Sequence, residues 1–100
     1  MSAPSATAVP KEYQIILTDD HSILRAGVKV LIEGKPGFKV VGEVGNGQDL
    51  LDLLAKVPCD MVVLDLNMPL MNGIEALEYM QMHFPRVAVL VLTTHKEKPF

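Results

Sequence analysis

The chain has 100 residues, of which 49% are hydrophobic and 21% are charged, and its formal net charge is −3. This length allows one domain, and the apolar fraction is typical of a globular protein rather than a disordered chain. No apolar run approaches the roughly 18 residues of a membrane helix, and the lack of a basic cluster disfavours direct nucleic-acid binding. The lone Cys59 excludes an internal disulfide and fits a reducing compartment. We therefore expect a small, soluble, cytoplasmic domain.

The first twelve residues differ from the rest. They begin with a stretch rich in Ser, Ala and Pro, with neither a basic start nor an apolar run. This composition favours a disordered tail over a signal peptide. We expect a tail over residues 1–12 and one domain over residues 13–100.

A strand and then a helix are predicted at the start of the domain. The apolar run at residues 13–18 indicates a strand. From Ser22 the apolar residues recur at helical spacing, and charged residues occupy the other faces. The apolar residues are Leu24, Val28, Leu31 and Ile32, and the charged ones are Arg25, Lys29 and Glu33. Residues 34–37 end this helix, because proline cannot continue it and glycine suits a helix C-terminus.

The same alternation continues to residue 57. Residues 38–44 predict a second strand, and the Gly-Asn-Gly sequence at 45–47 predicts a turn. A second helix is indicated by Leu50, Leu53, Leu54 and Val57.

Two further strands enclose a third helix. Residues 60–65 and 86–92 are almost continuously apolar, as is typical of strands covered on both faces. Between them, residues 67–73 predict a loop, and Ile74, Leu77, Met80 and Phe84 mark a helix that ends at Pro85.

Helices between buried strands predict a parallel sheet with right-handed crossovers, that is, an open doubly wound α/β domain. Such sheets usually carry one more strand with its helices, roughly 25–30 residues. We therefore expect four of five strands, with an unpaired edge on the fourth. That edge should promote self-association or exchange of segments between chains.

Acidic residues follow two strands at the edge of the sheet where open α/β proteins bind ligands. Asp19 and Asp20 follow the first strand, and Asp65 ends the third. We expect these strands to be neighbours, so that three carboxylates meet in one pocket. Two carboxylates 4 Å apart repel by about 4 kcal/mol at an effective dielectric near 20, so three need a proton or a cation.

Mg²⁺ matches this set of ligands, because it prefers carboxylates, backbone carbonyls and water, and it often also binds phosphoryl oxygens. With Thr93 at the end of the fourth strand, the pocket predicts phosphoryl chemistry, with a carboxylate as nucleophile and a hydroxyl beside it. Asp19 or Asp20 could instead cap the first helix. His21 could approach the metal, although a polar residue of the first helical turn is the favoured interpretation.

Three motifs in order resemble the receiver domain of two-component response regulators. They are Asp19-Asp20-His21, residues 65–69 followed by Asn72-Gly73, and residues 91–93. The stretch from residue 19 to 44 is similar to the NarL/FixJ (LuxR-type) class. The resemblance covers about residues 13–100 and implies a flavodoxin- or CheY-like fold that stops before its fifth strand.

The resemblance also implies a role for each matching residue. Asp65 would accept a phosphoryl group from a phosphohistidine on a partner histidine kinase. Asp20 and Asp65 would bind Mg²⁺ directly, with the backbone carbonyl of Asn67, and Asp19 would act mostly through water. Thr93 would donate its hydroxyl to a phosphoryl oxygen and signal the phosphorylated state.

Further implications concern hydrolysis and output. Asn67 and His95 stand where the family tunes hydrolysis of the acyl phosphate. The phosphorylated domain would switch homodimerisation or a DNA-binding helix-turn-helix domain outside this sequence, so that DNA is contacted only through that domain. The family's lysine on the fifth strand has no counterpart here, because Lys96 and Lys98 follow Thr93 too closely. The chain would be a signalling domain that assists its own phosphorylation and dephosphorylation, rather than an enzyme.

Two other functions stay open. One is an aspartyl-phosphate phosphatase of the haloacid-dehalogenase kind, a class of enzymes with an Asp-x-Asp motif at the first strand. Here Asp65-Leu66-Asn67 lies on the third strand and lacks the second acid. A domain that binds partners independently of phosphorylation would keep only the fold, and unchanged partner affinity in Asp65→Asn would favour it.

Overall fold

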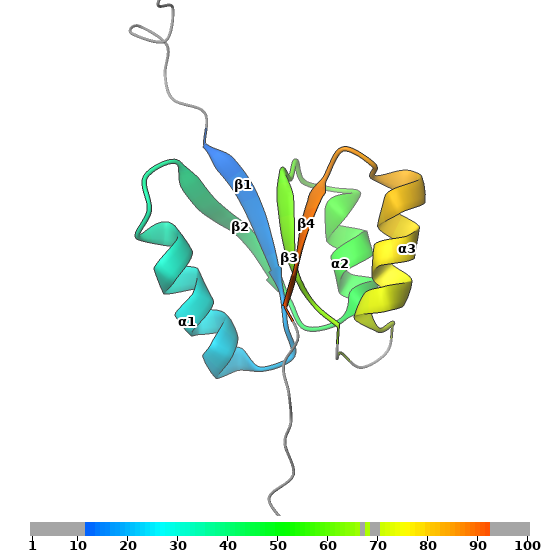
Figure 1. Cartoon of the computed structure of the whole chain (residues 1–100), viewed down its shortest axis with the longest axis horizontal. Helices are drawn as coiled ribbons and strands as arrows, with labels where there is room; N and C mark the ends of the chain where they lie inside the picture. Colours follow the sequence, from blue (N-terminus) through cyan, green and yellow to red (C-terminus); the bar gives the residue numbers. More distant parts are fainter. Residues whose placement is uncertain (1–11, 67, 69–70, 93–100) are drawn as a thin grey trace, which may run out of the picture.

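The computed structural model describes residues 12–66, 68 and 71–92, and its strands and helices alternate along the chain (Figure 1). The elements are β1 (Tyr13–Thr18), α1 (Ser22–Glu33), β2 (Phe38–Val44), α2 (Gly47–Leu54), β3 (Met61–Asp65), α3 (Gly73–His83) and β4 (Ala88–Leu92). The strands form one sheet in the order β2-β1-β3-β4, and all neighbouring strands are parallel. The predicted open, doubly wound α/β fold with four parallel strands is confirmed.

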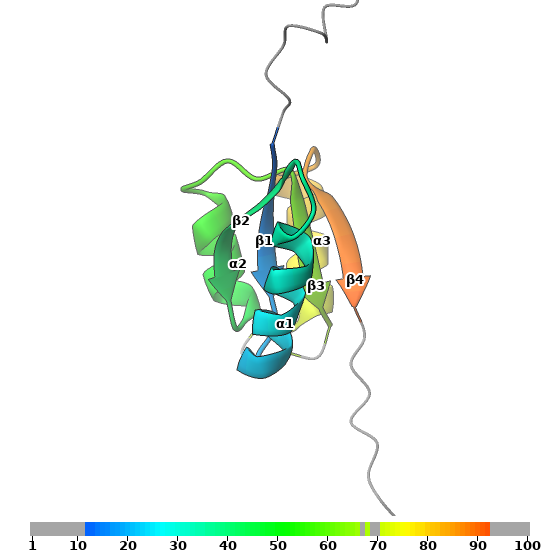
Figure 2. The same ribbon diagram turned by 90° about the vertical axis from the view of Figure 1, so that its left-hand side faces the viewer.

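The helices cover both faces of the sheet. Helix α1 lies on one face, and α2 and α3 lie on the other (Figures 1 and 2). The strand order reverses between β1 and β3, which pair from Ile15↔Met61 to Thr18↔Leu64. Because parallel strands end at the same edge of a sheet, the residues that follow β1 and β3 emerge side by side. This is the place where open α/β sheets form their ligand sites.

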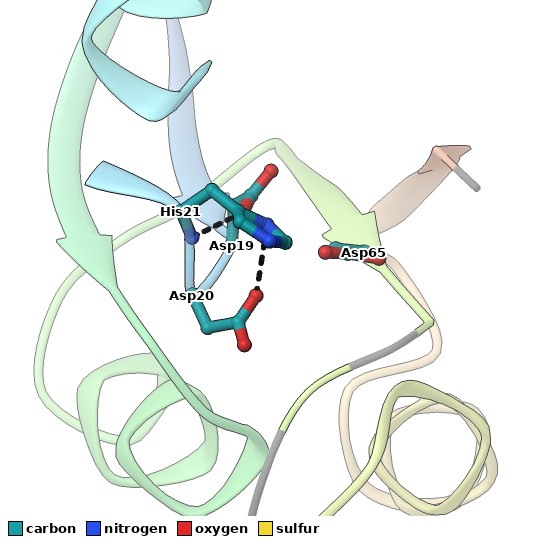
Figure 3. Close-up of side chains that lie close together, drawn as sticks. All are labelled: Asp19, Asp20, His21 and Asp65. Atoms are coloured by element: carbon teal, nitrogen blue, oxygen red, sulfur yellow. Dashed lines mark hydrogen bonds and ion pairs between the residues drawn. The ribbon is translucent and has the colours of Figure 1, made fainter. Parts of the chain in front are cut away.

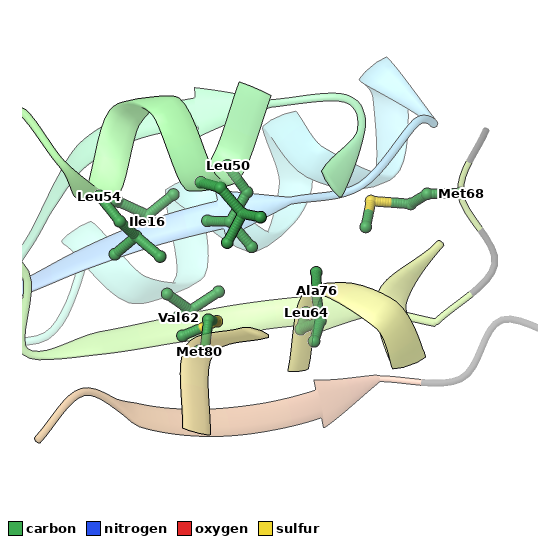
Figure 4. Close-up of a cluster of buried hydrophobic side chains, with 9 residues drawn as sticks. Ile16, Leu50, Leu54, Val62, Leu64, Met68, Ala76 and Met80 are labelled. Atoms are coloured by element: carbon green, nitrogen blue, oxygen red, sulfur yellow. The ribbon is translucent and has the colours of Figure 1, made fainter. Parts of the chain in front are cut away.

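The larger of two hydrophobic cores lies between the sheet and helices α2 and α3. Side chains of β1 and β3 pack there against the inner faces of both helices (Figure 4). Its buried members are Ile16, Leu50, Leu51, Leu54, Val62, Leu64, Met68, Ala76 and Met80.

The smaller core lies on the α1 face, and its buried members within the described residues are Ile15, Leu17 and Val63. Val28 and Ile32 of α1 pack against it, as the helical spacing predicts. The other two residues of the predicted apolar stripe, Leu24 and Leu31, are 40% and 72% exposed. Periodicity identifies the apolar side of a helix, but it does not reveal how much of that side the sheet covers.

Strand β4 is less covered than its apolar sequence predicts. It is an edge strand of the described sheet, and Leu90 and Val91 are 49% and 40% exposed. Leu90 also borders an apolar groove of about 260 Å³ between α1 and the sheet. The expectation that this strand is covered on both faces is therefore wrong for the described residues.

Parts of the predicted organisation fall outside the described residues, namely residues 1–11 of the tail, residues 67, 69 and 70 of the predicted loop, and residues 93–100. In the described part of the chain, each helix is too short or too polar to cross a membrane.

Candidate functional site

The turn between β1 and α1 carries two adjacent acids. Asp19 directly follows β1 and is buried, with 5% of its surface exposed, whereas Asp20 is exposed. The backbone N–H of Asp19 donates to the carbonyl of Val44 at 3.0 Å, which extends the pairing of β1 with β2 by one residue. The parallel sheet therefore fixes where the first acid stands.

His21 lies between these two carboxylates (Figure 3). Its backbone N–H donates to Oδ1 of Asp19 at 2.6 Å, and its Nδ1 lies 3.1 Å from that oxygen and 3.0 Å from Oδ1 of Asp20. His21 is also the N-cap residue of α1, so neither aspartate occupies the cap position that the alternative interpretation gave them. The imidazole therefore lies at the start of α1, close to the favoured interpretation as a polar residue of the first helical turn, and it is at the same time a member of the cluster.

Asp65 completes the cluster from the end of β3. It is fully buried, and in Figure 3 its carboxylate faces the β1–α1 turn from the opposite side of the site. One ligand atom each from Asp19, Asp20, His21 and Asp65 can be chosen so that all four lie within 4.8 Å of one another. The structure therefore brings together the three carboxylates that the sequence placed at the ends of two strands.

The donor set of this cluster fits a small divalent cation. Three carboxylates supply the hard oxygen ligands that Mg²⁺ prefers, and Mg²⁺ commonly keeps water in its remaining positions. Concentrated negative charge in a partly buried pocket is unfavourable unless a cation or a proton offsets it. The residues present fit Mg²⁺.

The start of α3 is pressed against the backbone that carries Asp65. Gly73, the first residue of α3, donates its N–H to the carbonyl of Leu66 at 3.2 Å. A Cβ placed on Gly73 would lie 2.5 Å from Cα of Leu66 and 2.6 Å from the carbonyl oxygen of Asp65. Only glycine allows this close approach of helix and strand end.

A capping box fixes the same helix end. Oδ1 of Asn72 accepts from the N–H of Glu75 at 2.9 Å, and Oε1 of Glu75 accepts from the N–H of Asn72 at 3.4 Å. Nearby, the N–H of Gly47 donates to the carbonyl of Met71 at 3.0 Å, which ties the start of α2 to the segment before α3. The predicted turn at 45–47 is therefore the cap of α2, since Asn46 accepts the N–H of Asp49 at 2.8 Å.

Three of the predicted site residues, Asn67, Thr93 and His95, lie outside the described residues, and their roles stay predictions. Sequence reasoning missed one contact of the site completely. Nη1 of Arg25 donates to the carbonyl oxygen of Asp19 at 2.8 Å. Helical spacing placed Arg25 away from the apolar stripe, and no local pattern shows that its side chain returns to the turn before α1.

Comparison with known proteins gives a consistent result. The model of the response regulator receiver domain family matches residues 15–100. The nitrate/nitrite response regulator protein NarL of Escherichia coli strain K12 is 42% identical over an alignment of 85 residues, which covers 83% of this chain and 39% of NarL. The chain spans only about two fifths of the length of the curated relatives that it matches, 37% and 39% in two of them.

Solved structures agree in fold and sequence. A LuxR-family two-component response regulator from Aurantimonas sp. SI85-9A1 superposes with a TM-score of 0.79 at 35% identity, covering 86% of this chain and 61% of that one. RcsB from Salmonella enterica serovar Typhimurium, bound to promoter rprA in the presence of phosphomimetic BeF3-, gives a TM-score of 0.79 at 30% identity, covering 86% and 72%.

Proposed function

Because the chain belongs to the family of response regulator receiver domains, we propose that it is a signalling domain in which Asp65 accepts a phosphoryl group from a phosphohistidine on a histidine kinase. The observation that carries this proposal is the convergence of Asp65 with Asp19 and Asp20 at the carboxyl edge of the sheet. A buried carboxylate beside two others is suited to act as a nucleophile once a cation offsets their charge.

In the proposed reaction, one carboxylate oxygen of Asp65 attacks the phosphorus atom. The bond from phosphorus to the donor imidazole nitrogen breaks, and the imidazole leaves with the electron pair and takes up a proton from solvent. The product is an acyl phosphate on Asp65. The protein's contribution is mainly to position the nucleophile and to stabilise charge, as is general for phosphoryl transfer.

Asp20 and Asp65 would hold Mg²⁺ directly, together with the backbone carbonyl of Asn67, and Asp19 would act mostly through water. When bound there, the ion would neutralise negative charge on the phosphoryl oxygens. Thr93 would donate its hydroxyl to a phosphoryl oxygen, and Asn67 and His95 would set the rate at which the acyl phosphate hydrolyses.

The output of the switch is proposed from relatives. RcsB binds promoter DNA in a structure that contains a phosphomimetic, and this chain matches only part of such proteins. We infer that phosphorylation shifts a conformational equilibrium that controls dimerisation or a DNA-binding domain outside this sequence, in the cytoplasm, and so regulates transcription.

The test is phosphorylation of the 100-residue chain by a small phosphoramidate, which carries the same P–N bond as phosphohistidine. Intact-mass measurement should show one added phosphoryl group that depends on Mg²⁺, is removed by hydroxylamine as expected of an acyl phosphate, and is absent in Asp65→Asn. Asp52→Asn is the matched control, because Asp52 is exposed on α2 and bonds only to Gln48 in the described contacts. It should be phosphorylated as the wild type is.

The alternatives predict different outcomes. Repeated turnover of a phosphomonoester would favour the phosphatase. A folded chain that takes up no phosphoryl group, together with unchanged partner affinity in Asp65→Asn, would favour a phosphorylation-independent interaction domain. Persistent labelling of Asp65→Asn would refute the assignment of the nucleophile.

A further inference from the structure

Asp19 is held by three neighbours through three different polar atoms. Its N–H donates to the carbonyl of Val44 at 3.0 Å, its carbonyl accepts from Nη1 of Arg25 at 2.8 Å, and its Oδ1 accepts from the N–H of His21 at 2.6 Å. Asp19 and Asp20 lie between β1 and α1, outside regular secondary structure. Contacts with His21, α1 and the end of β2, rather than a regular backbone, therefore hold this turn in place.

Two of these three partners, Arg25 and His21, also contact Asp19 through their side chains, and Arg25 is the one of the two that lies inside α1 and binds the main chain of Asp19. The Arg25 side chain is 23% exposed, and its Nε lies 3.4 Å from Oε1 of Glu43, which stands on β2. A Cβ placed on Gly45 would lie 3.6 Å from Nη1, so the guanidinium also lies close to the connection that follows β2. Arg25 thus joins α1, the turn after β1 and the end of β2.

We propose that Arg25 is a positioning residue of the acidic cluster, which holds the main chain of Asp19 so that the Asp19 and Asp20 carboxylates face Asp65. This inference rests on the proposed role of the cluster as a divalent cation site. A planar guanidinium can serve the carbonyl and Glu43 at once in a fixed geometry, whereas a lysine ammonium is a single flexible point charge. Partners that orient metal ligands commonly change metal affinity when they are removed.

A simpler role for Arg25 would be to attach α1 to β2 through Glu43. Lys29 makes the same kind of attachment, because its Nζ lies 3.1 Å from Oε2 of Glu43. Unlike Arg25, Lys29 has no described contact with Asp19. Comparing variants of Arg25 and Lys29 therefore distinguishes the positioning of the acids from the attachment of α1 to β2.

The experiment is calorimetric titration of Mg²⁺ into the 100-residue chain and its variants, with the metal-free thermal midpoint measured for each. Arg25→Met should weaken Mg²⁺ binding by about 10–100-fold. Arg25→Lys should recover little of the affinity, because lysine cannot make both contacts. Lys29→Met should bind Mg²⁺ within about twofold of the wild type, whatever its effect on the thermal midpoint.

A spectroscopic readout separates positioning from general loosening. In metal-free Arg25→Met, the amide resonances of Asp19 and Asp20 should shift, whereas that of Asp65 on β3 should stay in place. Should Arg25→Met fail to fold, the same Mg²⁺ titrations are made with Arg25→Lys and Glu43→Gln. Each of these variants keeps a side chain of similar length and disturbs the contacts of the Arg25 guanidinium.

Wild-type affinity in folded Arg25→Met, or in both substitute variants, would overturn the inference, as would an equal loss of affinity in Lys29→Met. If the wild type binds Mg²⁺ and Asp65→Asn abolishes binding, the proposed cation site stands whatever Arg25 does. A folded wild-type chain that binds no Mg²⁺ would overturn both.

Discussion

Replacement of Gly73 by alanine tests whether the start of α3 sets the position of Asp65. The new Cβ would lie 2.5 Å from Cα of Leu66 and 2.6 Å from the Asp65 carbonyl oxygen. Ordinary contact begins near 3.4 Å, so the helix or the strand end has to move by about 0.9 Å. Both obstacles are backbone atoms, and therefore a rotamer change cannot relieve them.

The expected loss of stability follows from two opposing effects. Overpacking of this kind costs about 1–3 kcal/mol, and the better helix propensity of alanine returns up to about 1 kcal/mol. A net loss of about 1–2 kcal/mol lowers the thermal midpoint of a domain of this size by about 5–15 °C. Because the displaced backbone carries Asp65, the affinity for Mg²⁺ should fall as well.

Thermal unfolding followed by circular dichroism measures the first effect, and calorimetry measures the second. Gly27→Ala is the matched control, since Gly27 lies inside α1 and a Cβ there would have nothing within 4 Å. That substitution should stabilise the chain by about 0.5–1 kcal/mol and leave Mg²⁺ binding unchanged. If Gly73→Ala raises the midpoint as Gly27→Ala does, the argument from close approach is wrong.

Three further predictions concern the cap of α3, the buried core and the thiol of Cys59. Asn72→Ala removes the capping box of α3 and should cost about 1 kcal/mol in urea unfolding; an unchanged midpoint would contradict this role. Leu50→Ala leaves a cavity at a fully buried position and should lower the free energy of unfolding by about 2–5 kcal/mol. Leu31→Ala, at a 72% exposed position, should change it by no more than about 0.5 kcal/mol. Similar losses of stability in both variants would refute the distinction between the buried α2/α3 side and the open α1 side. Burial raises the pKa of the Cys59 thiol, so the protonated thiol stabilises the fold below the thiol pKa of the unfolded chain, and this contribution is lost as the pH rises through the folded value. Alkylation at about pH 8.5, near the ordinary thiol pKa, should therefore be slower in the folded chain than in urea, and equal rates would argue against the burial.

The sequence was sufficient to predict every strand and helix of the described fold. Short apolar runs and helical spacing depend on local backbone geometry, which is why β1 and β3 lie close to where the sequence places them. Helix α2 is displaced toward the N-terminus, because it begins at Gly47 and ends at Leu54, before the predicted helical residue Val57. The sequence did not predict which apolar residues are covered. Leu31 and Leu90 resemble core residues in their spacing, yet both border an open groove, because coverage depends on distant segments.

The convergence of the acids was predictable for a similar reason. Strand ends meet at one edge in a parallel sheet, so Asp19, Asp20 and Asp65 could be placed together before their side chains were seen. The contact of Arg25 with Asp19 was not predictable, because it depends on how α1 crosses β2. The roles assigned to Thr93, Asn67 and His95 stay predictions.

The two faces of the sheet differ in how many apolar residues they bury, and this difference affects which part of the domain unfolds first. Among the described residues, the α2/α3 side contains nine buried apolar residues and the α1 side contains three, so we expect α1 to detach in local excursions before the sheet itself unfolds. Each excursion would carry the β1–α1 turn, and with it Asp20, away from Asp65. An ion bound between these carboxylates would therefore stabilise the docked position of α1. Binding of the ion should slow amide hydrogen exchange along the whole helix, including residues far from the carboxylates.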